Sequence, residues 1–231
     1  GTLTFEITGV TRTTTYYVRS YVTNNPPTVY GNEVSFTTAE GPMILVFNTN
    51  LSTGNTIELP LYGTVNVTVD WGDGNTDTYT TTGNKIHTYS SAGSYTVTID
   101  GELTQYGNGP SAPAGADKLT KVESFGEIGL TSLSGAFCGT SNLSEVPAML
   151  PTSVIDLSHC FQGCAATSIN NLANWNVSSV TDMSKMFYEA TSFDQDISSW
   201  DVTSVTTMES MFSNVTLSMT NYDAILKAWA S

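Results

Sequence analysis

The chain has 231 residues and a formal net charge of -14, because seven Lys and Arg stand against 21 Asp and Glu. Its 39% of hydrophobic residues can bury a core, which excludes an intrinsically disordered chain. The negative charge argues against nucleic acid and anionic membrane surfaces as partners. The longest apolar run, residues 43–47, is far shorter than the roughly 20 residues that span a bilayer, so we expect no membrane insertion.

The cysteines and the start of the chain bear on its compartment. Three cysteines, Cys138, Cys160 and Cys164, do not make a disulfide framework. The chain opens Gly1-Thr2-Leu3 without a signal-like segment, and we expect a trimmed amino terminus. Scarce Lys and Arg with abundant Thr, Ser and Asn suit an extracytoplasmic protein.

Residues 1–40 alternate apolar and polar side chains over 3–7, 16–22 and 31–38, which predicts three strands, with a turn at 24–27. The string Thr15-Tyr-Tyr-Val-Arg-Ser-Tyr-Val22 followed by Gly31-Asn-Glu-Val-Ser-Phe-Thr37 resembles the last three strands of a fibronectin type III domain. Such domains have about seven strands. The resemblance implies a partial module, and its open edge allows self-association.

Residues 41–102 contain short strand-like segments at 43–48, 56–61, 64–71, 77–81 and 94–100, a spacing typical of a β-sandwich. The motifs Trp71-Gly-Asp-Gly74 and His87-Thr-Tyr89, followed by Gly93-Ser-Tyr-Thr-Val97, resemble the polycystic-kidney-disease (PKD) type of immunoglobulin-like domain. Asp70, Asp73 and Asp77 are close enough in sequence to hold a hard cation. We favour the alternative, in which Asp70 and Asp73 bond the turn backbone and His87 supports a strand turn.

Residues 103–231 contain an internal repeat. Phe137, Phe161, Phe187 and Phe212 are spaced by 24, 26 and 25 residues, a period within the range of leucine-rich repeats. The spacing of Val180, Met183, Met186 and Phe187 predicts one helical face per copy, and the following extended stretch predicts one strand. Stacked copies would share a continuous core, with an amphipathic helix at 221–229 as a cap.

The stretch from Met183 to Thr206 resembles the repeat of BspA-like bacterial surface leucine-rich-repeat proteins, which is shared with mycoplasma-type lipoproteins. The expected fold class is therefore multi-domain and mainly β. Immunoglobulin-like β-sandwich modules are followed by a leucine-rich-repeat solenoid of β-strand plus helix. The expected domains are 1–40, a partial fibronectin type III module; 41–102, a PKD-like sandwich; and 103–231, the solenoid with its capping helix.

Several residues are candidates for chemistry. Cys160 and Cys164 align with positions of the repeat that are expected in the core, whereas Cys138 aligns with positions expected to be exposed and could be a free thiol. His159 is the only conceivable base for a catalytic cysteine, and we expect it on an outer face. Asp194 and Asp196 share one face, but the sequence indicates no cleft of the kind that paired glycosidase carboxylates need, so we expect solvated surface. Trp175 and Trp200 recur regularly and are expected in the core.

The function that follows is non-enzymatic binding at the bacterial cell surface or outside the cell, without cofactor or metal. The resemblance implies adhesion to host or matrix proteins or to other cells, through a protein or glycan ligand. The candidate binding residues are polar residues at repeat positions that we expect to be exposed: Glu145, Asn170, Asn171, Asp194, Gln195, Asp196, Ser198 and Ser199. The alternatives are an accessory carbohydrate-directed module of a secreted enzyme, a catalytic activity within the chain, and a self-associating surface layer.

Overall fold

The computed structural model describes residues 15–22, 28–37 and 41–230. Its contacts divide the chain into two units, Gly1–Gly41 and Pro42–Ser231. The strand expected at 3–7 and the turn expected at 24–27 lie outside the described residues. No helix within the described ranges is both long enough and apolar enough to cross a membrane.

The first unit contains an antiparallel hairpin of β1 (Thr15–Val22) and β2 (Val29–Thr37). Val18 pairs with Val34, and the facing Arg19 and Glu33 form an ion pair of 2.6 Å between Nη2 and Oε2. Both strands expected in this part of the chain are therefore confirmed. The PKD and fibronectin assignments of the first 102 residues, and the domain limits, stay predictions.

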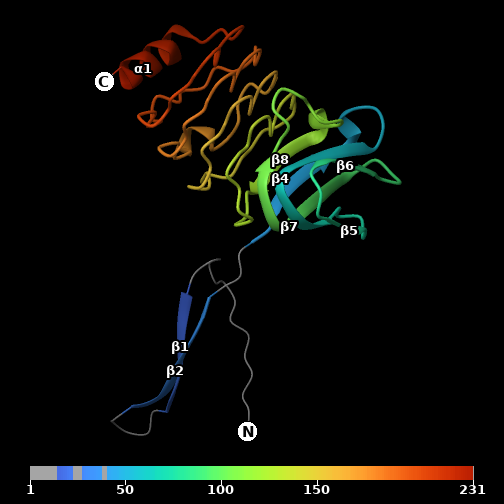
Figure 1. The fold of residues 1–231 in the computed structure, drawn as a ribbon, viewed down its shortest axis with the longest axis vertical. Coiled ribbons are helices and arrows are strands. Elements are labelled where there is room, and N and C mark those ends of the chain that lie inside the picture. The colour runs from blue at the N-terminus through green and yellow to red at the C-terminus, as the bar shows by residue number, and fades with distance from the viewer. Residues whose placement is uncertain (1–14, 23–27, 38–40, 231) are drawn as a thin grey trace. The chain divides into compact units, whose positions relative to one another are not determined.

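The second unit begins with a six-stranded antiparallel sheet (Figure 1). Its strands are β3 (Met43–Asn48), β4 (Thr56–Asp70), β5 (Thr76–Tyr79), β6 (Gly83–Thr88), β7 (Ser94–Tyr106) and β8 (Leu119–Ser124). The order is β5-β4-β7-β3-β8, with β6 also paired to β4. Alternate residues of β3 and of the second half of β4 are buried, so one face of the sheet forms the core, as the sequence alternation predicts.

β4 explains how one sheet replaces the expected sandwich. The segments 56–61 and 64–71 are a single strand of 15 residues. Its first residues pair with β6 and its last residues with β5, whereas β7 pairs with it from Leu61 onward, with a register shift between Tyr62 and Val65. Gly63 lies in this bulge with a φ of 67°, a conformation that glycine adopts without strain. The bulge therefore lies within the β4–β7 pairing, and one long strand serves three partners in one sheet.

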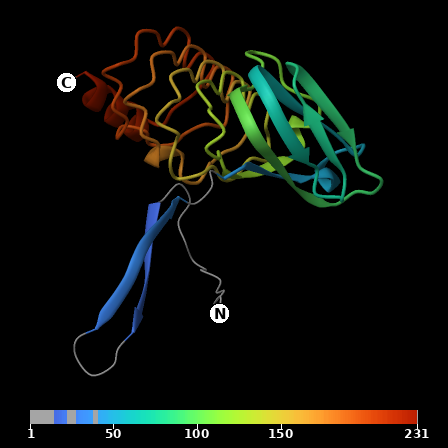
Figure 2. The ribbon, with the colours of Figure 1, turned by 60° about the horizontal axis from the view of Figure 1, so that its bottom comes forward.

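The sheet is followed by a turn-rich region, residues 125–217, in which the expected repeat is confirmed. Single parallel β-bridges join Ser132 to Asp156, Asp156 to Asp182, and Asp182 to Thr207. The four aligned phenylalanines form a column, with ring centroids 5.3, 5.6 and 5.7 Å apart. Figure 2 shows the loops of successive copies running side by side from the sheet toward the C-terminal helix.

The expected helical arm of each copy is wrong, and the backbone gives the reason. Lys185 and Glu189 have φ of 54° and 59°, in the left-handed region, which an α-helix does not contain. Met186 N bonds Met183 O three residues back, whereas Phe187 N bonds Met211 O of the next copy. The N–H groups therefore alternate: one closes a turn within its own copy, and the next donates to a carbonyl of the neighbouring copy. This alternation, rather than a helix, points every third or fourth side chain into the core.

The expected fold class is therefore wrong. The described residues form a two-stranded sheet, a six-stranded sheet and the turn-rich region, with α1 (Met219–Trp229) as their one α-helix. Three short 3-10 helices lie at Thr49–Leu51 (η1), Ala116–Lys118 (η2) and Leu172–Asn174 (η3). They do not form a strand-plus-helix solenoid after immunoglobulin-like sandwiches. The sheet and the turn-rich region share one hydrophobic core, from Met43 to Ile225.

α1 begins two residues earlier than expected. Its N-cap is Ser218, whose side chain accepts a hydrogen bond from Asn221 N. Ile225 is buried, but Tyr222 and Leu226 on the same apolar face remain 51% and 49% exposed. Only part of the amphipathic face is therefore covered.

Candidate functional site

A row of polar side chains crosses successive copies along one side of the second unit. Parallel bridges place Lys121 beside Glu145, and Glu145 beside Asn170. Backbone bonds fix the spacing, because Val122 N donates to Glu145 O and Val146 N donates to Asn170 O. We call Lys121, Glu145, Asn170 and Gln195 the polar row.

Gln195 continues the polar row by a different contact. Its Oε1 accepts from Ile169 N at 2.9 Å, and its Nε2 donates to Ile169 O at 3.2 Å. A side-chain amide thus substitutes for the backbone pairing that joins the earlier copies, and both polar atoms of Gln195 are occupied. This role suits an amide, which carries one donor and one acceptor group.

Charges alternate at the start of the polar row. Lys121 Nζ lies 3.2 Å from Glu145 Oε1 and 3.6 Å from Glu123 Oε1. The hydrogen bond with Glu145 is the main cause that raises the pKa of the Lys121 ammonium. These side chains are between one third and one half exposed, so solvent screens the pairs, and we assign them little stabilising energy.

The other candidate residues differ in how free their side chains are. Asn171 Nδ2 donates to Val146 O, and Ser199 Oγ donates to Ala173 O. Asp194 Oδ1 accepts from Ser218 N, and Asp196 Oδ1 accepts from Ser198 N. These contacts position loops and α1.

Asn170 is the exception among the candidates. It is exposed, and no group in the described ranges bonds its side-chain amide, although its backbone N donates to Ser144 O. The sequence did not predict Lys121, which is bridged to Glu145, or Glu123, which pairs with Lys121. Lys121 lies 24 residues before Glu145, so the repeat spacing itself was the signal.

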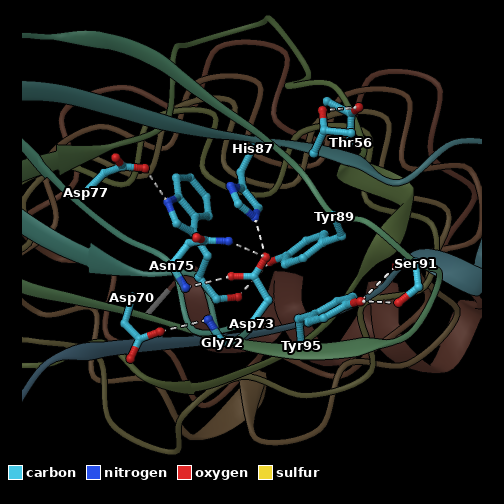
Figure 3. A network of polar contacts seen from close by, with 12 residues as sticks. Thr56, Asp70, Gly72, Asp73, Asn75, Asp77, His87, Tyr89, Ser91 and Tyr95 are labelled. Carbon is cyan, nitrogen blue, oxygen red and sulfur yellow. Dashed lines mark hydrogen bonds and ion pairs between the residues drawn. The ribbon is translucent and has the colours of Figure 1, made fainter.

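The acidic residues of the sheet have separate partners (Figure 3). Asp70 Oδ1 accepts from Gly72 N, and Asp73 Oδ1 accepts from Asn75 N, so both make the expected turn contacts. Asp77 Oδ2 accepts from Trp71 Nε1 at 2.8 Å, and the described residues contain no cluster suited to a metal ion.

His87 links this turn to an aromatic cluster. Its Nε2 lies 2.9 Å from Asp73 Oδ2, and its ring stacks on Trp71 at a centroid distance of 4.6 Å. Tyr89 contacts the ring edge-on and donates its hydroxyl to Trp71 O. Burial raises the pKa of Tyr89, which keeps this phenol a donor. The cluster supports the strand turn, as expected for His87.

The cysteines are all buried and free. Cys160 and Cys164 occupy core slots as expected, but the expectation of an exposed Cys138 is wrong, because this residue is 4% exposed. The Gly107–Ala112 segment covers it, and its Sγ contacts Pro110 O at 3.4 Å. Burial raises the pKa of the Cys138 thiol to about 11. His159, the conceivable base for a catalytic cysteine, instead contacts Gln162: its Nδ1 lies 2.5 Å from Gln162 Oε1.

The two tryptophans of the repeat are buried, as expected, at 3% exposure each. Trp175 Nε1 donates to Pro147 O at 3.0 Å, whereas Trp200 Nε1 is buried without a partner in the described part of the chain. Recurrence of tryptophan therefore reflects packing between copies.

Comparison with known proteins gives one finding. A family model described as a Mycoplasma protein of unknown function, DUF285, matches residues 131–230. No curated protein matches the chain, and no solved structure matches it. The match covers four turn-rich copies and α1, and it agrees in coarse form with the resemblance to mycoplasma-type repeats.

Proposed function

We propose that the protein is a non-enzymatic binding protein of the bacterial cell surface or the extracellular space, and that the polar row contacts an extracellular protein or glycan. The observation that carries this proposal is the continuity of the row across successive copies. Backbone bonds hold Lys121, Glu145 and Asn170 at fixed spacing, and Gln195 joins them through its side-chain amide, so little backbone entropy is lost when a partner binds along the row.

The ionisation of the carboxylates favours binding over acid catalysis. Hydrogen bonds from the Ser218 backbone and from Asn221 lower the pKa of Asp194, and bonds from Ser198 lower that of Asp196. A general acid needs a raised pKa to hold its proton near neutral pH. These groups instead present ionised acceptors, which suit a partner with N–H or O–H donors.

Charge narrows the class of partner. With a net charge of -14, the chain attracts basic surface patches and repels acidic ones. The match to a mycoplasma family and the resemblance to surface repeat proteins support the proposed location. The proposed role is adhesion.

The test is saturable binding of the full chain to a panel of matrix proteins and glycans. Asn170→Ala should weaken binding, whereas Asn66→Ala, which removes another exposed amide from β4, should not. Glu145→Gln should weaken binding more than Glu127→Gln, a matched charge change at an exposed position outside the row. Equal effects of row and control variants would refute the polar row as the binding surface.

A second candidate is an accessory carbohydrate-directed module of a larger secreted enzyme. One observation favours it: Tyr17, Tyr21 and Tyr30 of the β1–β2 hairpin are 62 to 67% exposed. Flat aromatic rings present apolar faces together with a hydroxyl group, and sugar rings can stack on them. Binding restricted to glycans and lost in Tyr21→Ala, with Asn170→Ala unaffected, would favour this candidate.

Self-association through the hairpin is a further part of the proposal. Within the described residues, β2 pairs with β1 on one side and with no strand on the other. Unpaired strand edges can recruit another chain. Sedimentation at increasing concentration tests this, because a monomer throughout would exclude it.

A further inference from the structure

The last copy of the turn-rich region ends in a row of unused backbone donors. At the interface before it, the N–H groups of Met183, Lys185, Phe187 and Glu189 all donate to carbonyls of the last copy. The aligned N–H groups of the last copy have no such acceptor: in the described part of the chain, nothing accepts from Met208, Ser210, Phe212 or Asn214. We call these four groups the donor row.

The donor row borders an apolar cavity. A cavity of about 590 Å³ lies between the last copy, with Met208, Met211 and Phe212, and α1, with Tyr222, Ile225 and Leu226. Trp229 of α1 stacks on Phe212 at a centroid distance of 6.4 Å and so continues the phenylalanine column, but α1 leaves the donor row unbonded. Unpaired donors beside an apolar cavity are unfavourable when left dry, and they favour a partner that supplies both acceptors and an apolar side chain.

The hydrogen-bonding pattern disfavours end-to-end stacking of the donor row on a second copy of this chain. Two donor rows facing each other would oppose N–H to N–H. The leading edge of the first copy is also occupied, because Ser132 O accepts from Tyr106 N and Ser134 O accepts from Gly109 N. The occupant must present carbonyls at every second residue, as the trailing edge of each turn copy does.

We infer that the donor row and the adjoining cavity bind a segment of another polypeptide. Carbonyls of that segment accept hydrogen bonds from the N–H groups of Met208, Ser210, Phe212 and Asn214, and one of its large apolar side chains lies between the last copy and α1. This surface is continuous with the interfaces that already join the copies. It is distinct from the polar row, and its partner is recognised mainly through backbone groups, as when a peptide adds a strand to a sheet edge.

A synthetic peptide copying residues 205–217 is the probe, because the carbonyls of Thr207, Glu209, Met211 and Ser213 already make such bonds within the chain. The full chain should bind this peptide and not a scrambled one. Amide exchange provides the direct readout: the four N–H groups of the donor row should exchange fast in the free protein and slow on peptide binding.

Leu226→Lys should weaken peptide binding about tenfold or more, because it puts an ammonium into the apolar cavity. Ile155→Lys is the matched control, since Ile155 is 48% exposed against 49% for Leu226 and does not line the cavity. No binding above the scrambled peptide would overturn the inference. Binding without protection of the donor row, or a dimer of the chain that Leu226→Lys abolishes, would overturn it as well.

Discussion

Asp194 anchors the start of α1 through Asn221. The Asp194 Oδ1 atom accepts from Asn221 Nδ2 at 2.8 Å, and Asp194 O accepts from the same amide at 3.0 Å. Ser218 N, at the N-cap, donates to the same carboxylate. One side chain of the third copy thus fixes both the cap and the first turn of the helix, which makes Asp194 a positioning residue as well as a candidate binding residue.

Asp194→Ala is expected to loosen α1, because it removes two hydrogen bonds that hold the helix against the third copy. Amide exchange should rise in residues 219–229 and change little in β3. Asp201→Ala is the control, since within the described residues Asp201 bonds only Thr203 in its own turn. Unchanged exchange in α1 would show that packing of Ile225 and Trp229 alone positions the helix.

Phe161→Ala tests the phenylalanine column. Phe161 is fully buried and lies within 6 Å of the rings of Phe137, Phe187 and Trp175. The cavity left by the ring should lower the free energy of unfolding by about 3–5 kcal/mol, measured by urea denaturation. Ile155→Ala, in the same copy but half-exposed, should lower it by less than about 1 kcal/mol. Similar losses in the two variants would contradict a shared column.

The parts of the fold that could be predicted are those set by local alternation or strict periodicity. Strand β3 has the expected bounds, and the column of Phe137 to Phe212 follows from the repeat spacing. The form of each copy could not be predicted, because left-handed residues such as Lys185 give apolar side chains almost the same spacing as a helix. The sequence did not predict β6, because its residues alternate between partly buried and exposed positions and none of them is fully buried.

The candidate site shows the same limit. Alignment of the repeat located exposed positions correctly for Asn170, Asp194, Asp196 and Ser199, whereas Glu145, Asn171, Gln195 and Ser198 are only partly exposed. The alignment carries no information on hydrogen bonds between copies. Gln195 and Asp194 therefore looked like free polar groups, although their partners Ile169 and Asn221 lie 26 and 27 residues away in sequence. Such contacts are tertiary, and no local pattern encodes them.

Gly107→Ala tests the junction between the sheet and the turn-rich region. Gly107 has a φ of 121°, and a Cβ there would lie 2.2 Å from Ser134 O, which is a backbone atom. The control is Gly54→Ala, where φ is 79° and nothing lies within 4 Å. The control should lose roughly 1–2 kcal/mol through backbone strain alone. Gly107→Ala should lose at least about 2 kcal/mol more by the same denaturation assay; equal losses would mean that the junction yields easily.

Asp73 should make stability depend on pH in the acid range. Partial burial acts to raise the pKa of this carboxyl, but the hydrogen bonds from His87 and Asn75 outweigh it and leave the pKa below its ordinary value of 3.8. An unfolded chain therefore binds this proton more readily than the folded one. The stabilisation from Asp73 is fully present above about pH 4, the range of the unfolded carboxyl, and is lost as pH falls through the lower folded-state pKa.

Asp73→Asn should consequently flatten the decline in unfolding free energy between about pH 5 and pH 2. Asp223→Asn, at an exposed position of α1, is the matched control and should leave the slope unchanged. If both variants keep the wild-type slope, the contacts of Asp73 with His87 and Asn75 do not persist in solution.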